Sequence, residues 1–109
     1  MTYANLSKFY INGAWVAPLG GTTMGVENPA TEEIVAQVAL GSVADADRAI
    51  MAARAAFDGF TTWSTDDRIA LLERILAEYN ARYDDFAQAM STEMGAPMAW
   101  AKEAQAWAG

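Results

Sequence analysis

The spacing of apolar residues changes near Gly41, and this change limits the chain to one class of fold. Up to Leu40, apolar residues form short runs separated by Gly, Asn and Pro, as in strands joined by turns. From Ser42 onward, apolar residues recur at every third or fourth position, as on one face of a helix. The sequence therefore predicts an α+β chain in which short antiparallel strands, paired as a hairpin or meander, precede three to four helices.

The clearest turn signal is Asn12-Gly13, which lies between the apolar runs 9–11 and 14–16. An Asn-Gly pair favours a two-residue hairpin turn because both turn positions need a positive φ, which these residues adopt readily. We therefore expect the two runs to pair as an antiparallel hairpin.

Further strands are expected before the change of period. Residues 18–22 predict a loop, and residues 23–27 a strand. Pro29 presets φ for the second position of a turn over residues 28–31. Residues 34–40 are β-branched and apolar enough for a strand that is buried on at least one face.

The first helix is expected to begin at Ser42, a good N-cap, with Asp45 placed where a carboxylate suits both a capping box and the helix dipole. Gly59 is the expected terminator of this helix. One apolar face is predicted to be buried, formed by Ala46, Ala49, Ile50, Ala53, Ala56 and Phe57.

A second helix is expected to start at Ser64 or Thr65, with Asp66 and Asp67 in its first turn. Its predicted buried stripe consists of Ile69, Leu72, Ile75, Leu76 and Tyr79. On its exposed side, ion pairs are expected among Arg74, Glu78 and Arg82.

The remaining helices follow a bend expected at residues 82–84. Gly95 is predicted to cap one helix, and Pro97 to be the first residue of the next. The last helix carries an apolar stripe of Trp100, Ala104 and Trp107. This pattern stops at Gly109 without a cap, which suggests a truncated chain.

Charge and composition argue against several kinds of binding partner and cellular location. The net charge is -7, with 14 acidic and 7 basic residues, and such a field repels nucleic acid and disfavours an anionic membrane. No signal peptide or membrane span is visible. With no cysteine there is no disulfide framework, which agrees with a cytoplasmic location.

No catalytic centre can be built from these residues. The chain has no Cys and no His, so it lacks a thiol or imidazole for catalysis or for metal binding. The acidic doublets are expected to be structural because adjacent side chains point apart: Glu32-Glu33, Asp66-Asp67 and Asp84-Asp85. The hydroxyl and amino groups weighed as nucleophiles also have no visible activating neighbour: Ser42, Ser64, Ser91, Lys8 and Lys102.

The order of these motifs resembles the N-terminal segment of the NAD(P)-dependent aldehyde dehydrogenases. The resemblance covers nearly the whole chain from Phe9 on. It is carried by residues 9–15, the Asn-Pro turn within residues 27–38, the Ala-rich helix of residues 41–57, Trp63 with Arg68 and Leu72, and the acidic-x-Gly-x-Pro segment of residues 93–97.

The resemblance implies that residues 1–109 are the N-terminal part of a Rossmann-like cofactor-binding domain, with strands and turns in residues 1–41 and helices in residues 42–109. In that family a cysteine thiolate attacks the aldehyde, and hydride passes to NAD or NADP before the thioester is hydrolysed. The nucleophile, the general base and the nucleotide-binding residues follow such a segment. This chain alone is therefore expected to bind no cofactor and to have no activity.

The resemblance also implies one candidate metal site. Some family members hold a structural Na⁺ or K⁺ at positions that correspond to the main-chain carbonyl of Glu27 and the side chain of Glu93, with a third ligand from later sequence. The alternative is that Glu27 is an ordinary surface residue and Glu93 an ordinary helix-end carboxylate.

Two kinds of protein remain open. The first is an aldehyde dehydrogenase fragment whose partner is the rest of its chain, or a second copy bound through exposed helix faces. Each large apolar side chain that stays in water forgoes roughly 2 kcal/mol of burial free energy, which favours such a partner. The second is a standalone acidic α+β interaction module without catalysis. Hydrolysis by the acidic residues is a further possibility, for which we expect no turnover.

Overall fold

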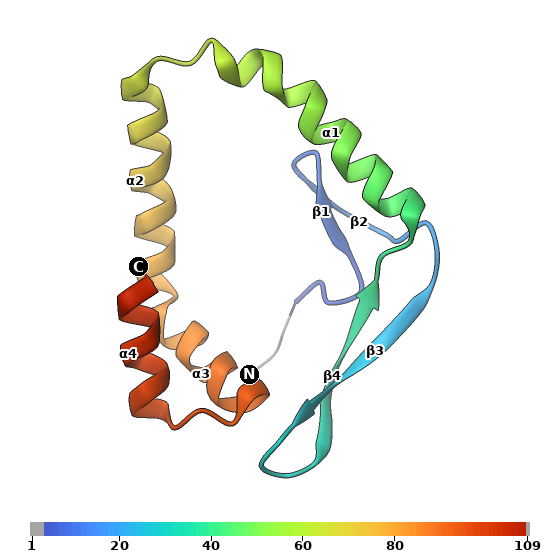
Figure 1. The fold of residues 1–109 in the computed structure, drawn as a ribbon, viewed down its shortest axis with the longest axis vertical. Helices are drawn as coiled ribbons and strands as arrows, with labels where there is room; N and C mark the ends of the chain where they lie inside the picture. The colour runs from blue at the N-terminus through green and yellow to red at the C-terminus, as the bar shows by residue number, and fades with distance from the viewer. Residues whose placement is uncertain (1–3, 109) are drawn as a thin grey trace. The chain divides into compact units, whose positions relative to one another are not determined.

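A computed structural model describes the backbone of residues 4–108 and the side chains of residues 4–104. The elements in chain order are β1 (Phe9–Ile11), β2 (Ala14–Val16), β3 (Thr22–Asn28), β4 (Glu33–Leu40), α1 (Val43–Thr61), α2 (Thr65–Ala81), α3 (Tyr83–Met94) and α4 (Met98–Ala108). The predicted α+β class with four helices is thus confirmed (Figure 1). The chain divides into two compact units. The first contains the residues up to Glu27 together with Ile34–Thr62. The second contains Asn28–Glu33 together with the residues from Trp63 on.

The first unit opens with the predicted hairpin. β1 and β2 pair antiparallel with Tyr10 opposite Trp15, and the two rings meet edge to face with their centroids 5.3 Å apart. Asn12 and Gly13 form the turn with φ values of 53° and 77°, as an Asn-Gly hairpin turn requires. The hairpin is therefore set by local sequence.

β3 and β4 form a second pair, joined by the predicted Asn-Pro turn. Asn28 closes this turn, since its Oδ1 accepts from the Ala30 amide at 2.9 Å and its carbonyl accepts from the Glu32 amide at 2.8 Å. β3 is longer than predicted by one residue at each end, and β4 begins one residue earlier than predicted. Ile34 and Leu40 on β4 remain exposed, so the predicted burial of one face of this strand is not complete within the chain.

α1 begins as predicted but does not end at Gly59, and that prediction was wrong. The helix continues to Thr61, where Thr62 acts as C-cap. The Gly59 carbonyl accepts from both the amide and the hydroxyl of Thr62, at 3.3 and 2.7 Å. With this carbonyl satisfied, nothing requires the left-handed conformation that makes glycine a terminator.

In the second unit, α2 begins at the predicted N-cap Ser64, and the predicted ion pair between Glu78 and Arg82 is present at 3.1 Å. Gly95 ends α3 in the left-handed region, with φ 70°, as predicted. Pro97 lies one residue before α4 rather than at its first position, and its carbonyl accepts from the Ala101 amide at 2.9 Å.

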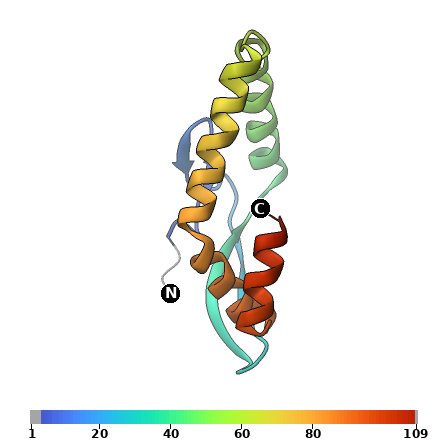
Figure 2. The same ribbon diagram turned by 90° about the vertical axis from the view of Figure 1, so that its left-hand side faces the viewer.

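α3 and α4 lie side by side in both views (Figure 1, Figure 2) and enclose the buried core of the described residues. This core consists only of Ala87, Ala96 and Ala101, with Met90 packed against it. No large side chain between residues 4 and 104 is fully buried. The Asn-Pro turn also belongs to this unit, where Pro29 lies against Gly95.

The predicted apolar faces exist but are exposed in this chain, so its own residues do not provide their predicted burial. Ile50 on α1 is 64% exposed and Leu72 on α2 is 63% exposed. The same holds for most of the other large members of these faces, namely Phe57, Ile69, Ile75, Leu76 and Trp100. The side chain of Trp107 lies outside the described residues. Periodicity identifies a face that needs cover, but it does not say whether the cover lies in the same chain.

Residues 4–108 contain no helix that combines the length and the hydrophobicity needed to cross a bilayer.

Candidate functional site

The most structured polar site of the first unit lies at the start of α1. Ser42 and Asp45 form a capping box: the Ser42 amide and hydroxyl both donate to Asp45 Oδ2, at 3.0 and 2.7 Å, and the Asp45 amide donates to Ser42 Oγ at 3.3 Å. The box satisfies amide groups that a helix start leaves unpaired. Asp45 is only 3% exposed, which is unusual for a capping carboxylate.

Asp45 is buried because a distant loop also binds it. Its Oδ1 accepts from the Leu19 amide at 2.8 Å, across 26 positions of sequence. Arg48 lies one turn further along α1, and its guanidinium donates to Asp45 Oδ1 at 3.3 Å and to the Ala17 carbonyl at 3.0 Å. We refer to Ala17, Leu19, Ser42, Asp45 and Arg48 as the Asp45 network.

The network stabilises the ionised form of its carboxylate. The Leu19 amide makes the largest contribution, followed by the amide and hydroxyl of Ser42, and the charge of Arg48 adds to them. Together they lower the pKa of Asp45 from 3.8 to about 2. Asp45 is therefore an acceptor of fixed hydrogen bonds at neutral pH, and it is not suited to act as a general base.

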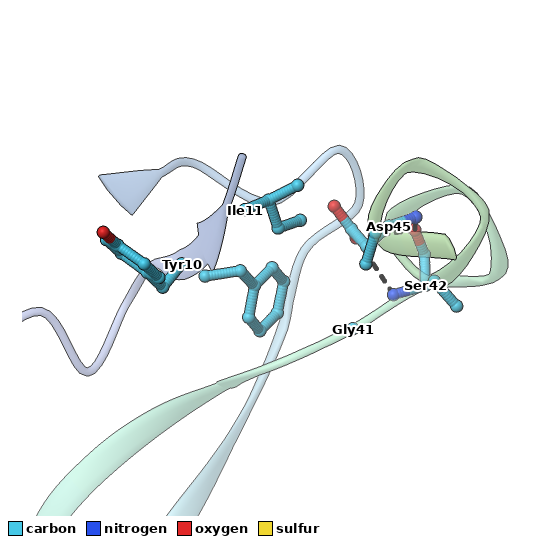
Figure 3. A pocket seen from close by; sticks show the side chains of 8 residues that line it. Tyr10, Ile11, Gly41, Ser42 and Asp45 are labelled. Atoms are coloured by element: carbon cyan, nitrogen blue, oxygen red, sulfur yellow. Dashed lines mark hydrogen bonds between the residues drawn. The ribbon is translucent and has the colours of Figure 1, made fainter. Parts of the chain in front are cut away.

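An open groove of about 370 Å³ lies beside this network. β1 forms one wall through Phe9, Tyr10 and Ile11, and the other wall is formed by Gly41 and Ser42 and by the first turns of α1 (Figure 3). The helix side presents small residues, among them Ala46 and Ala49, so the groove is mainly apolar. Its one acid, Asp45, and its one serine, Ser42, are held by the hydrogen bonds described above. The groove can therefore hold apolar groups.

The predicted site residues are not brought into a catalytic constellation. Glu27 is exposed on β3 in the first unit, and Glu93 is exposed on α3 in the second unit. Within residues 4–108 there is no group of three or more His, Cys, Asp or Glu side chains that could hold a metal ion. The monovalent cation site at Glu27 and Glu93 stays a prediction.

Most other candidates have structural partners. Ser64 and Asp67 form the capping box of α2, as predicted for Ser64. Lys102 pairs with Asp84 at 2.9 Å, and this hydrogen bond and charge raise the pKa of the Lys102 amine. A nucleophilic lysine needs the opposite shift, so Lys102 is an ordinary ion-pair partner.

Sequence reasoning found the Ser42–Asp45 box but missed the burial of Asp45 and its bonds to the loop. The box has a short-range signature, in which a hydroxyl residue is followed three positions later by a carboxylate. The Leu19 bond uses a backbone amide, which leaves no trace in residue type. The nearby Arg48 is the one residue type that could have signalled further partners of this carboxylate.

Comparison with known proteins places the chain in a family. The model of the aldehyde dehydrogenase family matches residues 15–107. A 3-succinoylsemialdehyde-pyridine dehydrogenase from a Pseudomonas species is 45% identical over 91 residues, which are 84% of this chain and 19% of that protein.

Solved structures agree with this match. An aldehyde dehydrogenase from Bartonella henselae has a TM-score of 0.88 and 45% identity, over 91% of this chain and 21% of that one. A variant of aldehyde dehydrogenase C from Pseudomonas syringae, in complex with NAD⁺ and octanal, has a TM-score of 0.87 and 49% identity, over 90% of this chain and 20% of that one. The chain thus spans about a fifth of the length of these relatives. It belongs to the aldehyde dehydrogenase family.

Proposed function

We propose that this chain is the N-terminal part of the cofactor-binding domain of an NAD(P)-dependent aldehyde dehydrogenase. In this proposal residues 1–41 supply strands and turns, and residues 42–109 supply helices that pack on the rest of the domain. The family match over residues 15–107 supports the assignment, as does the alignment with about a fifth of each relative. The whole enzyme would oxidise an aldehyde to a carboxylic acid.

The catalytic groups belong to the remainder of that enzyme. A thiolate nucleophile is absent because the chain has no cysteine, and Asp45 is saturated with hydrogen bonds. The chain alone therefore binds no NAD or NADP and forms no product. Its contribution is a scaffold: it presents apolar helix faces to the part of the enzyme that carries the active site.

The observation that carries this proposal is that the helices have large apolar faces, whereas the buried core of the described residues is very small. The only buried apolar residues among those described are three alanines, Ala87, Ala96 and Ala101. Large side chains such as Ile50 and Leu72 stay mostly in water. Each would gain roughly 2 kcal/mol on burial, which is a strong drive to bind further sequence.

The nature of the partner follows from the same features. The remainder of the enzyme is the principal partner, and a second copy of the chain can cover the same faces when that remainder is absent. The net charge of -7 argues against nucleic acid and anionic membranes. We place the enzyme in the cytoplasm, as an oligomer, on the absence of cysteine and on its family.

A chimera tests the proposal. Residues 1–109 would replace the matching N-terminal segment of aldehyde dehydrogenase C from Pseudomonas syringae, the relative whose structure holds NAD⁺ and octanal. We expect the purified chimera to reduce NAD⁺ in the presence of octanal, followed by NADH absorbance, and the isolated chain to form none.

Two variants of the chimera test whether the apolar face of α2 packs on the rest of the enzyme. Leu72→Asp places a charge on the exposed apolar face of α2 and should lower the activity at least about tenfold, because burying an unpaired carboxylate is costly. Glu73→Ala changes the next residue, which is exposed and polar, and should leave the activity unchanged. NADH formation by the isolated chain would contradict the proposal, and so would a soluble, folded chimera that neither binds NAD⁺ nor turns over.

A further inference from the structure

Two helices begin with the same capping box, but only one box is buried. In α1, Ser42 Oγ donates to Asp45 Oδ2 at 2.7 Å, and in α2, Ser64 Oγ donates to Asp67 Oδ2 at the same distance. Asp67 is exposed, whereas Asp45 is almost fully buried. The difference between the two sites therefore isolates what the surroundings of Asp45 add to an ordinary cap.

The surroundings add a connection to a distant loop. In the α2 box the Asp67 carboxylate accepts from the amide and hydroxyl of Ser64, and the Asp67 amide donates to Ser64 Oγ. Asp45 binds Ser42 in the same way and also accepts from the Leu19 amide at 2.8 Å. Arg48 reinforces this connection, since one guanidinium nitrogen donates to both Asp45 and the Ala17 carbonyl.

The two oxygens of the Asp45 carboxylate accept hydrogen bonds from different partners. Oδ1 accepts from the Leu19 amide of the loop and from Arg48, while Oδ2 accepts from the amide and hydroxyl of Ser42 at the helix start. Neither oxygen can turn toward another partner without leaving an amide unpaired. Both bonds are partly buried, and an amide left unpaired in such a place costs more than a bond lost at the open surface.

We propose that the Asp45 network couples the loop after β2 to the first turn of α1, so that the two segments open and close as one unit. The coupling also fixes the groove of Figure 3, because β1 forms one wall and the coupled helix start forms the other. The Phe9 ring lies over Gly41 at this junction and adds an apolar contact between the walls. The proposal concerns this chain alone and does not depend on the enzyme to which it belongs.

Amide hydrogen exchange of the chimera described under Proposed function, read at single residues by mass spectrometry, tests the coupling. Asp45→Ala removes the capping box together with the loop connection, and the matched control Asp67→Ala removes only a capping box. We expect Asp45→Ala to accelerate exchange at the amides of both Leu19 and Ser42 by at least about tenfold. Asp67→Ala should accelerate exchange only near Ser64.

A subtler variant distinguishes coupling from two independent contacts. Asp45→Asn keeps the shape of the side chain but has one acceptor oxygen, which can face either Leu19 or Ser42. Coupled segments would lose protection at both amides together. Independent segments would keep one of the two amides protected, and that result would overturn the proposal. Equal exchange at Leu19 in the Asp45→Ala and Asp67→Ala variants would overturn it too, as would an unprotected Leu19 amide in the unchanged chimera.

Discussion

At the scale of single residues, Asp45 shows how one carboxylate can organise a region that has almost no apolar core. The side chain is 3% exposed in a chain whose large apolar residues are mostly in water. Its burial is tolerated because four donors from Leu19, Ser42 and Arg48 point at it. Hydrogen bonding therefore provides here part of the order that packing provides in larger proteins.

The depressed pKa of Asp45 predicts a defined sensitivity to acid. The folded chain binds the proton less readily than the unfolded chain, with pKa values of about 2 and 3.8. The contribution of this carboxylate to stability is therefore fully present above pH 3.8, and is lost as the pH falls through about 2. Titration of the Asp45 carboxyl carbon by NMR should give a midpoint near the lower value.

Removal of one donor provides the control for this titration. Ser42→Ala eliminates the hydroxyl that donates to Oδ2, so the midpoint should rise toward 3.8 while the Leu19 bond keeps it from reaching that value. A midpoint at or above 3.8 in the unchanged chain would show that the network does not form in solution.

At the scale of secondary structure elements, the two glycines near helix ends have opposite roles. Gly95 ends α3 with a φ of 70°, and a Cβ placed there would lie 3.0 Å from Pro29 Cγ. Gly59 lies inside α1, and a Cβ there would meet nothing within 4 Å beyond the adjacent backbone of its own helix. The same substitution should therefore have opposite effects at the two positions.

We expect Gly95→Ala to lower the free energy of unfolding by about 1–2 kcal/mol, because an L-residue is strained in the left-handed region. Gly59→Ala should raise it by up to about 1 kcal/mol, because alanine favours a helix interior. Urea unfolding followed by circular dichroism, with all variants at the same protein concentration, measures both changes. Destabilisation by Gly59→Ala would mean that α1 ends at Gly59 after all, and a neutral Gly95→Ala would argue against the left-handed cap.

The elements themselves were largely predictable from the sequence, because their signals are local. The Asn12-Gly13 turn, the N-caps Ser42 and Ser64, and the Gly95 cap each depend on residues within a few positions, and all four were confirmed. The end of α1 was not predictable, since it depends on how the Gly59 carbonyl is satisfied. Burial was not predictable either, because it depends on atoms that lie beyond the helix in question.

At the scale of the whole molecule, the chain combines a high net charge with uncovered apolar faces. Like charges oppose association, and at -7 the repulsion is appreciable at low salt. The apolar faces oppose this repulsion, with exposed side chains on all four helices, such as Ile50, Leu72, Phe86 and Trp100. The net free energy of folding is small for a chain of this size. Attraction between the apolar faces of two copies therefore decides whether the chain stays monomeric.

We propose that these faces are covered by further aldehyde dehydrogenase sequence in the whole enzyme, and the solution state of the isolated chain tests this proposal. Light scattering combined with calorimetry at moderate salt should show assemblies larger than a monomer, or a monomer without a cooperative melting transition. A monodisperse monomer that melts cooperatively would show that the chain is complete by itself, and would contradict the proposal.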